Sequence, residues 1–304
     1  MRAFVRWTPK TDGEIIEIYY VVSGGANVRS LDFTPFKTLV SAYSHHHQGI
    51  AWPPAQRNLL RKSPMIIADS GMIGAMIDGV QTWKDENEKV AQFGELVDAD
   101  LVATLDMPCE PNFLENVNLT LEKALNITIR NAKWRLDHPI NRKTIWVVQG
   151  QKLQDYQWCA EEMEAIGCFS EGWVGLGTTC RRTPREGLYS IARWARSRWP
   201  DRHIHAFGVG QPTYIAELDS IGIDSTDTGG PANWTAFNQI RYQNLKTPNS
   251  LPLDYYAHLF HVNVLALERE IEIAKERRTT QMIITDPFLD REVTELPTIE
   301  FTDH

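Results

Sequence analysis

Leu101-Val102-Ala103-Thr104-Leu105-Asp106 is a short apolar run that ends on a carboxylate, and three other runs also stop on a polar residue able to do chemistry. They are residues 65–71 (MIIADSG), 145–150 (IWVVQG) and 222–227 (GIDSTD). Strands of a parallel sheet are buried on both faces, so they read as continuous apolar stretches. In a parallel barrel the residues just past the carboxyl ends of the strands converge on one mouth. The four runs therefore predict an α/β fold, a TIM-type (β/α)8 barrel, whose mouth holds several carboxylates and one amide.

The length and composition of the chain fit one large barrel. The chain has 304 residues, 42% of them hydrophobic, and a barrel of this class typically needs about 250 residues. We expect a single domain over 1–304, with an N-terminal extension at 1–37, a barrel core at 38–286 and a C-terminal tail at 287–304. The formal net charge of −8 argues against a uniformly basic surface. A local basic stripe could still bind nucleic acid, so net charge leaves the partner open.

Strand-like runs alternate with longer amphipathic segments almost from end to end, as right-handed βαβ units require. Seven strands are expected near 38–43, 65–69, 101–105, 144–149, 173–177, 203–208 and 222–226. The eighth lies either near 14–22 or near 282–285. Helices are expected at about 80–98, 114–137, 151–166, 184–198, 211–219 and 254–277.

The cysteines and the hydropathy pattern indicate a cytoplasmic protein. Cys109, Cys159, Cys168 and Cys180 show no C-x-x-C spacing, which favours free thiols in a reducing compartment. No amino-terminal segment resembles a signal peptide, and no apolar run is long enough to span a bilayer. We therefore expect no membrane partner.

Asp69, Asp106 and Asp227 would meet at the mouth of such a barrel. Mutual repulsion and partial burial would raise the pKa of some of these carboxyls and leave others ionised. One ionised Asp can attack an anomeric carbon while a second carboxyl protonates the leaving group. A third can accept hydrogen bonds from a ring N–H and an amine of a purine edge, which Gln149 also complements. A single Asp at a strand end is more often a helix N-cap, but four such ends together favour a shared site.

Five short motifs stand in an order that is known from one protein family. They are Asp69-Ser70-Gly71 (family D-S-G-G-F-Q), Val148-Gln149-Gly150 (V-Q-G), Phe207-Gly208-Val209-Gly210-x-Pro212 (M-G-V-G-x-P), residues 222–227 (G-[VI]-D-M-F-D) and residues 255–260, YYAHLF (Y-L-H-H-L-F). With these motifs the chain resembles, from about residue 65 to 275, the tRNA-guanine transglycosylases and their DNA-modifying relatives.

The resemblance implies a base exchange. Asp227 would attack C1′ of a guanine nucleotide, guanine would leave, and a 7-deazaguanine such as 7-cyano-7-deazaguanine (preQ0) would take its place on the covalent intermediate. Asp69 would be the general acid and base. Ile73 stands where the family has a stacking aromatic, so one face of the base would lose its ring. Phe207 stands where the family has Met, so the other face would gain one.

The same resemblance implies a set of substrate-binding residues. Asp106 and Gln149 would hold the base edge, backbone N–H groups from Gly175 to Gly177 would meet its carbonyl side, and Phe207 would pack on its face. The full set is Ser70, Asp106, Gln149, Gly150, Gly175, Leu176, Gly177, Phe207 and Gly208.

The largest departure from the family concerns zinc. The tRNA enzymes carry a C-x-C-x-x-C insert and a His that together form a closed tetrahedral site. This chain has no cysteine after Cys180, and Ala257 stands in place of that His, so the ligands are missing together. We therefore expect a zinc-free branch with no metal and no cofactor. The P-T-R that follows the nucleophile in the tRNA enzymes is also replaced, by residues 228–234 (TGGPANW).

Residues 175–182 (GLGTTCRR) indicate the polynucleotide. They resemble a G-x-G-[ST]-x-C-R-R-like element of the DNA-guanine transglycosylases of phages and of bacterial DNA-modification clusters. DNA and a free 7-deazaguanine base are then the expected partners, with the host cytoplasm as the location if the protein is phage-encoded. Arg181 and Arg182 would contact nucleic acid, whereas Arg193, Arg196 and Arg198 fit a solvated helix better than a phosphate contact. A homodimer is also compatible with the sequence.

Two alternatives to a DNA enzyme remain. The same exchange could act on tRNA, and incorporation into tRNA but not DNA would establish that. A non-catalytic nucleic-acid-binding paralogue on the same barrel is disfavoured, because Asp69, Asp106, Gln149 and Asp227 are all present.

Overall fold

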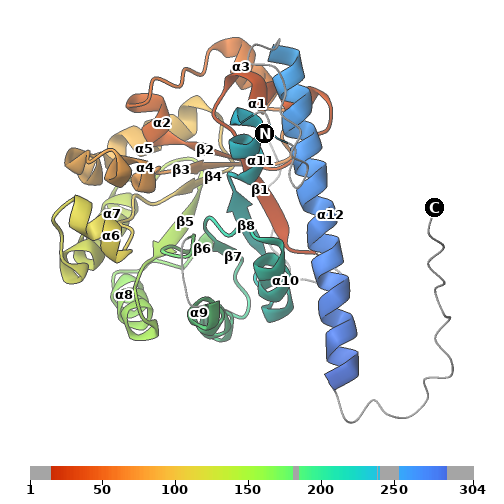
Figure 1. The fold of residues 1–304 in the computed structure, drawn as a ribbon. Coiled ribbons are helices and arrows are strands. Elements are labelled where there is room, and N and C mark those ends of the chain that lie inside the picture. Colours follow the sequence, from red (N-terminus) through yellow and green to blue (C-terminus); the bar gives the residue numbers. More distant parts are fainter. Residues whose placement is uncertain (1–14, 181–184, 238, 240–252, 286–304) are drawn as a thin grey trace, which may run out of the picture.

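Eight parallel strands close into one barrel, in which each strand pairs with its chain neighbour and the last pairs with the first (Figure 1). The structure, a computed structural model, describes residues 15–180, 185–237, 239 and 253–285. The strands are β1 (Glu17–Val21), β2 (Thr38–Ser41), β3 (Ile66–Asp69), β4 (Leu101–Ala103), β5 (Lys143–Val148), β6 (Trp173–Leu176), β7 (Ile204–Ala206) and β8 (Ser225–Thr228). The expected TIM-type (β/α)8 fold is confirmed.

Helices connect the strands and surround the barrel. They are α1 (Gly25–Arg29), α2 (Ala42–His46), α3 (Pro54–Leu60), α4 (Met72–Ile77), α5 (Asn87–Leu96), α6 (Pro111–Asn116), α7 (Leu121–Asp137), α8 (Leu153–Ala165), α9 (Arg185–Arg198), α10 (Pro212–Ile221), α11 (Gly230–Ala236) and α12 (Leu253–Thr285), with 3-10 turns η1 (Ser30–Asp32) and η2 (Gln81–Asp85). The long α12 runs along the outside and packs against α1, α10 and α11 (Figure 1). No helix in the described ranges is both long and apolar enough to cross a membrane.

The side chains inside the barrel come from alternate residues of each strand. The lower interior is an apolar cluster of Tyr19, Leu39, Ile67, Leu101, Ala103, Ile145, Val147 and Trp173. Because side chains of a strand alternate between its two faces, the residue two positions after an inward one also points inward. Asp69 follows Ile67 in this way, and Gln149 follows Val147. The packing of the core therefore directs these polar groups to the mouth.

The eighth strand is β1, one of the two expected positions, and the alternative at 282–285 lies within α12. β1 pairs with β2 on one side and with β8 on the other. The expected boundary between an extension at 1–37 and a core from residue 38 is therefore wrong, because the barrel cannot close without residues 17–21.

The last strand starts three residues later than its apolar signal indicated. Gly222 adopts the left-handed conformation that ends α10, at φ 92°, and Ile223 is fully buried beneath the connection. Asp224 accepts the backbone N–H of Ile204 at 2.7 Å. β8 itself is the polar sequence STDT, buried along its whole length. As a result Asp227 lies inside a strand and not in the loop after it.

Three of the arginines of α9 form ion pairs on the outside of the barrel. The pairs are Arg193–Glu217, Arg196–Asp224 and Arg198–Glu164. Arg196 also donates to four backbone carbonyl oxygens, those of Trp199, Pro200, Arg202 and Gly222. These contacts attach α9 to the start of β8, so these three arginines have structural partners.

Replacing Arg196 with alanine is expected to lower the free energy of unfolding by about 3 kcal/mol, because the buried Asp224 carboxylate would lose its guanidinium partner. Urea unfolding of the variant and of the wild type measures this change. Arg198→Ala removes a more exposed pair and is expected to cost less than about 1 kcal/mol. Equal losses in the two variants would contradict the role given to Arg196.

Candidate active site

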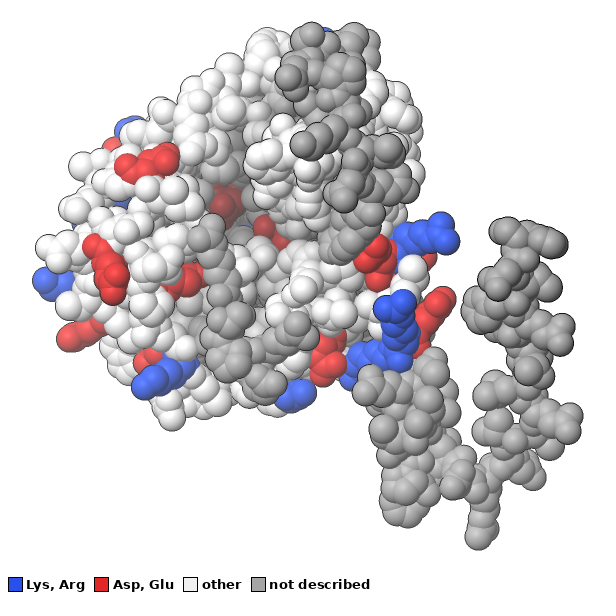
Figure 2. All heavy atoms as spheres, viewed as in Figure 1, with Lys and Arg blue, Asp and Glu red and all other residues white. Residues whose placement is uncertain are grey.

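A cavity opens at the carboxyl ends of the strands, and acidic side chains are visible inside the hollow in Figure 2. It encloses about 520 Å³, including space open to solvent. Its lining consists of Leu39, Asp69, Ser70, Met72, Ile73, Asp106, Pro108, Gln149, Gly177, Thr178, Thr179, Cys180, Phe207, Gly208 and Asp227. The three carboxylates and the amide expected at the mouth thus line one cavity. No Lys or Arg belongs to this described lining.

Asp69 ends β3, and the turn after it holds its carboxyl in place. The Gly71 N–H donates to Asp69 Oδ2 at 2.9 Å. This turn needs glycine, because Gly71 has φ 72° and an added Cβ would lie 2.2 Å from Ser41 Oγ. Burial, followed by the nearby charges of Asp106 and Asp227, raises the pKa of Asp69 to about 7. Asp69 can therefore both donate and accept a proton near neutral pH.

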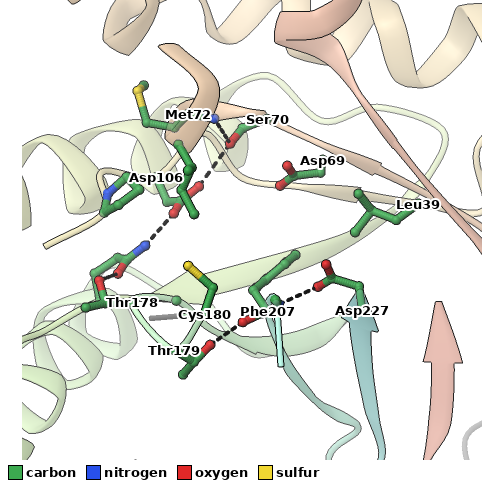
Figure 3. A pocket seen from close by; sticks show the side chains of 15 residues that line it. Leu39, Asp69, Ser70, Met72, Asp106, Thr178, Thr179, Cys180, Phe207 and Asp227 are labelled. Carbon is green, nitrogen blue, oxygen red and sulfur yellow. Dashed lines mark hydrogen bonds between the residues drawn. The ribbon is translucent and has the colours of Figure 1, made fainter. Parts of the chain in front are cut away.

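Asp227 lies in β8 with most of its side chain buried. The Gly208 N–H donates to Asp227 Oδ1 at 2.8 Å, and His205 Nε2 lies 3.1 Å from the same oxygen. Figure 3 shows the carboxyls of Asp69 and Asp227 at one end of the cavity, beside Leu39. The effect of Asp227 on the pKa of Asp69 agrees with this placement.

A second polar group occupies the other end of the cavity (Figure 3). Ser70 Oγ donates to Asp106 Oδ1 at 3.1 Å, and Gln149 Nε2 donates to Asp106 Oδ2. Thr178 Oγ1 in turn donates to Gln149 Oε1 at 2.5 Å, which fixes the orientation of the amide. Burial raises the pKa of Asp106 to about 6, so at neutral pH it is mostly an ionised acceptor. This chain of contacts presents one prearranged polar edge.

Thr178 holds this edge from a strained backbone. Its φ of 52° lies in the left-handed region, which is unusual for a β-branched residue. The Cys109 N–H donates to Thr178 Oγ1 at 2.8 Å, so the hydroxyl can direct its own hydrogen only toward another acceptor, and Gln149 provides it. Strain of this kind concentrates at functional sites. The sequence contained no signal for this conformation.

Some residues implied by the family resemblance do not line the cavity. Gly150, Gly175 and Leu176 are absent from the lining. Gly175 instead makes room for the ring of Phe207, because an added Cβ would lie 2.7 Å from that ring. The Gly177 N–H donates to the Val148 carbonyl at 3.0 Å, so it does not point at a ligand. The expected backbone contact from Gly175 to Gly177 is therefore wrong at Gly177.

Of the remaining expected residues, Ser70, Gly177, Phe207 and Gly208 line the cavity. Arg181 and Arg182 lie outside the described residues. His205 was missed, although the spacing His203-x-His205-x-Phe207 places it on the inner face of β7, next to Asp227. Within the described ranges, no group of three or more His, Cys, Asp and Glu side chains could hold a metal ion.

No family model matches the chain, and no match is found among curated proteins. The fold and the cavity define a barrel protein with two carboxyls at one end of a cleft and a hydrogen-bonding edge at the other.

Proposed function

We propose that this protein is a DNA-guanine transglycosylase, an enzyme that exchanges guanine in DNA for a free 7-deazaguanine. One observation carries the proposal: Asp69 and Asp227 face one end of a cavity whose other end holds Asp106 and Gln149. A nucleotide bound across this cavity would meet two catalytic carboxyls at its sugar and a polar edge at its base.

The two carboxyls at the sugar end divide the work of the exchange. Asp227 attacks C1′, the C1′–N9 bond breaks, and the electron pair leaves with guanine while Asp69 supplies a proton to the departing base. Asp69, now ionised, then removes the N9 proton of the incoming 7-deazaguanine. N9 attacks C1′, and the electron pair of the C1′–O bond returns to Asp227. The raised pKa of Asp69 suits it to both proton transfers.

The edge formed by Asp106 and Gln149 suits guanine and 7-deazaguanine alike. The two bases share the ring N–H, the amine and the carbonyl of one edge and differ at ring position 7. Ionised Asp106 keeps lone pairs that can accept from the ring N–H and the amine, and Gln149 can donate to the carbonyl. Phe207 and Ile73 offer apolar surface to the base faces. An exchange enzyme must bind the leaving and the incoming base at the same edge, and these two bases share it.

The choice of DNA over tRNA rests on the sequence. The zinc ligands and the P-T-R of the tRNA enzymes are missing, and residues 175–182 resemble the element of the DNA enzymes. The segment that replaces P-T-R runs from the end of β8 into α11. An enzyme that acts on one base must take it out of the stack or use an unpaired strand, so single-stranded DNA is a useful second substrate.

The direct test incubates the pure protein with DNA and preQ0, then digests the product to nucleosides for mass measurement. With plasmid or single-stranded DNA, we expect release of labelled guanine and appearance of the deoxynucleoside of preQ0. A parallel reaction contains tRNA. Incorporation into tRNA alone would reassign the substrate, and exchange on neither polymer would contradict the proposal.

Gly177→Ala is expected to weaken binding of free preQ0 about 10- to 100-fold. An added Cβ would lie 2.1 Å from Gln149 Nε2, which forces the amide away from Asp106 and disrupts the base edge. Titration calorimetry measures the affinity. Gly229→Ala is the matched control, because the nearest atom to its added Cβ is 3.9 Å away. Unchanged affinity in Gly177→Ala would argue that the base binds elsewhere.

A further inference from the structure

Asp227 ends a buried chain of polar side chains that runs through β7 and β8. His205 Nε2 lies 3.1 Å from Asp227 Oδ1, and His205 Nδ1 lies 2.8 Å from Ser225 Oγ. Ser225 Oγ also lies 2.7 Å from His203 Nε2. His205 and Ser225 have no solvent-exposed surface. Of the four residues in this chain, Asp227 is the one that lines the described cavity.

The ring of His205 is fixed in orientation by its aromatic neighbours. Tyr19 and Phe207 contact it edge-on, with ring centroids 5.7 Å and 4.5 Å away. His205 does not line the cavity, so it cannot touch a substrate there. Any role it has in the reaction must act through Asp227.

The distances fit one arrangement of protons for a neutral His205 beside an ionised Asp227. An ionised carboxylate only accepts, so His205 Nε2 must carry a hydrogen. A singly protonated ring then accepts at Nδ1, so Ser225 donates to Nδ1 and accepts from His203 Nε2. Every group between His203 and Asp227 is satisfied by this one direction of donation.

The two oxygens of Asp227 are not equivalent. Oδ1 accepts from both His205 and the backbone N–H of Gly208, at 3.1 Å and 2.8 Å. Among the described residues, none donates a hydrogen bond to Oδ2. We infer that His205 is a positioning residue, which together with Gly208 holds Oδ1 and leaves Oδ2 as the atom that attacks C1′. This inference rests on the proposed glycosyl transfer.

The same hydrogen bond shifts the balance between free carboxylate and glycosyl ester. The attack places a bond on Oδ2 and leaves Oδ1 as the carbonyl oxygen of a neutral ester. A hydrogen bond to a charged oxygen is roughly twice as strong as one to a neutral oxygen. His205 therefore stabilises Asp227 as a leaving group when the incoming base arrives. Removal of this donor favours the ester.

The test compares His205→Phe, His205→Gln and the control Tyr19→Phe. Each variant is mixed with labelled DNA and excess free guanine, and the protein–DNA ester is quantified after denaturation. We expect His205→Phe to raise the ratio of ester to free enzyme about tenfold and to slow exchange about 100-fold. The Gln amide can donate from nearly the same position, so His205→Gln is expected to stay within about tenfold of wild type. Tyr19→Phe keeps the ring that packs against His205 and removes only a hydroxyl that contacts Glu17 and Met65, so it is expected to match wild type.

Two results would overturn the inference while base exchange by the wild type stands. One is a loss of rate in His205→Phe with no rise in the ester ratio, which marks a structural role alone. The other is a nitrogen-15 spectrum of the wild type that places the His205 proton on Nδ1. Absence of exchange and of ester in the wild type itself would instead remove the proposed function, so the two failures are distinguishable.

Discussion

Asp227→Asn is expected to abolish base exchange, with a fall of at least about 10⁴-fold in the rate of guanine release. An amide oxygen cannot form the glycosyl ester. It can still accept from Gly208 and His205, so the fold and the base edge are expected to persist. Single-turnover release of labelled guanine from DNA measures the rate, and denaturing electrophoresis reports the loss of the protein–DNA ester.

Asp201→Asn is the matched control for this substitution, because it makes the same chemical change at an exposed position. It is expected to behave as wild type. Urea unfolding of both variants shows whether the fold is kept. If Asp227→Asn exchanged guanine at a rate near that of wild type, Asp227 could not be the nucleophile.

Asp69→Asn is expected to slow guanine release about 10³-fold and to remove its dependence on pH. In the proposed mechanism the protonated carboxyl assists departure of the base, and its pKa is raised to about 7. Guanine release is therefore expected to be level below about pH 7 and to fall about tenfold per pH unit above it. Rates measured across this range test the expectation. A wild-type profile that rises with pH would contradict the role as an acid.

The same carboxyl is expected to cost stability at alkaline pH. A pKa raised in the folded protein means that the folded state binds this proton more tightly than the unfolded chain does. The penalty is absent below the unfolded pKa of about 4, grows between about pH 4 and about pH 7, and keeps its full value above that range. Asp69→Asn is therefore expected to be more stable than wild type at about pH 8 and equal to it at about pH 4. A variant less stable at both would assign Asp69 a structural role.

The barrel and the main site residues were accessible from the sequence because parallel strands leave a strong apolar pattern. Each run that ended on Asp69, Asp106 or Gln149 also marked the edge of the sheet at which these side chains meet. Five helices of five to seven residues, α1 to α4 and α11, were not expected, because so few residues contain too little periodicity.

Other parts of the site depend on tertiary contacts that leave no local pattern. β8 is polar and leaves no apolar pattern, so the strand was expected too early in the chain, around the apolar Ile223. The left-handed conformation of Thr178 and the closeness of Gly177 to Gln149 appear only once β5 and β6 are paired. The position of His205 beside Ser225 depends on the register between β7 and β8, which the sequence pattern does not contain.

β1 closes the barrel by pairing directly with the strand that carries Asp227, and Tyr19 is its register partner. These two strands come from the early and late parts of the chain, so their pairing requires the most distant loop closure in the barrel. A ribosome makes β1 first and β8 last. During synthesis the growing polypeptide therefore carries Asp69 well before it carries Asp227. Under the proposed mechanism, a chain that ends before β8 has no nucleophile and is expected to form no glycosyl ester.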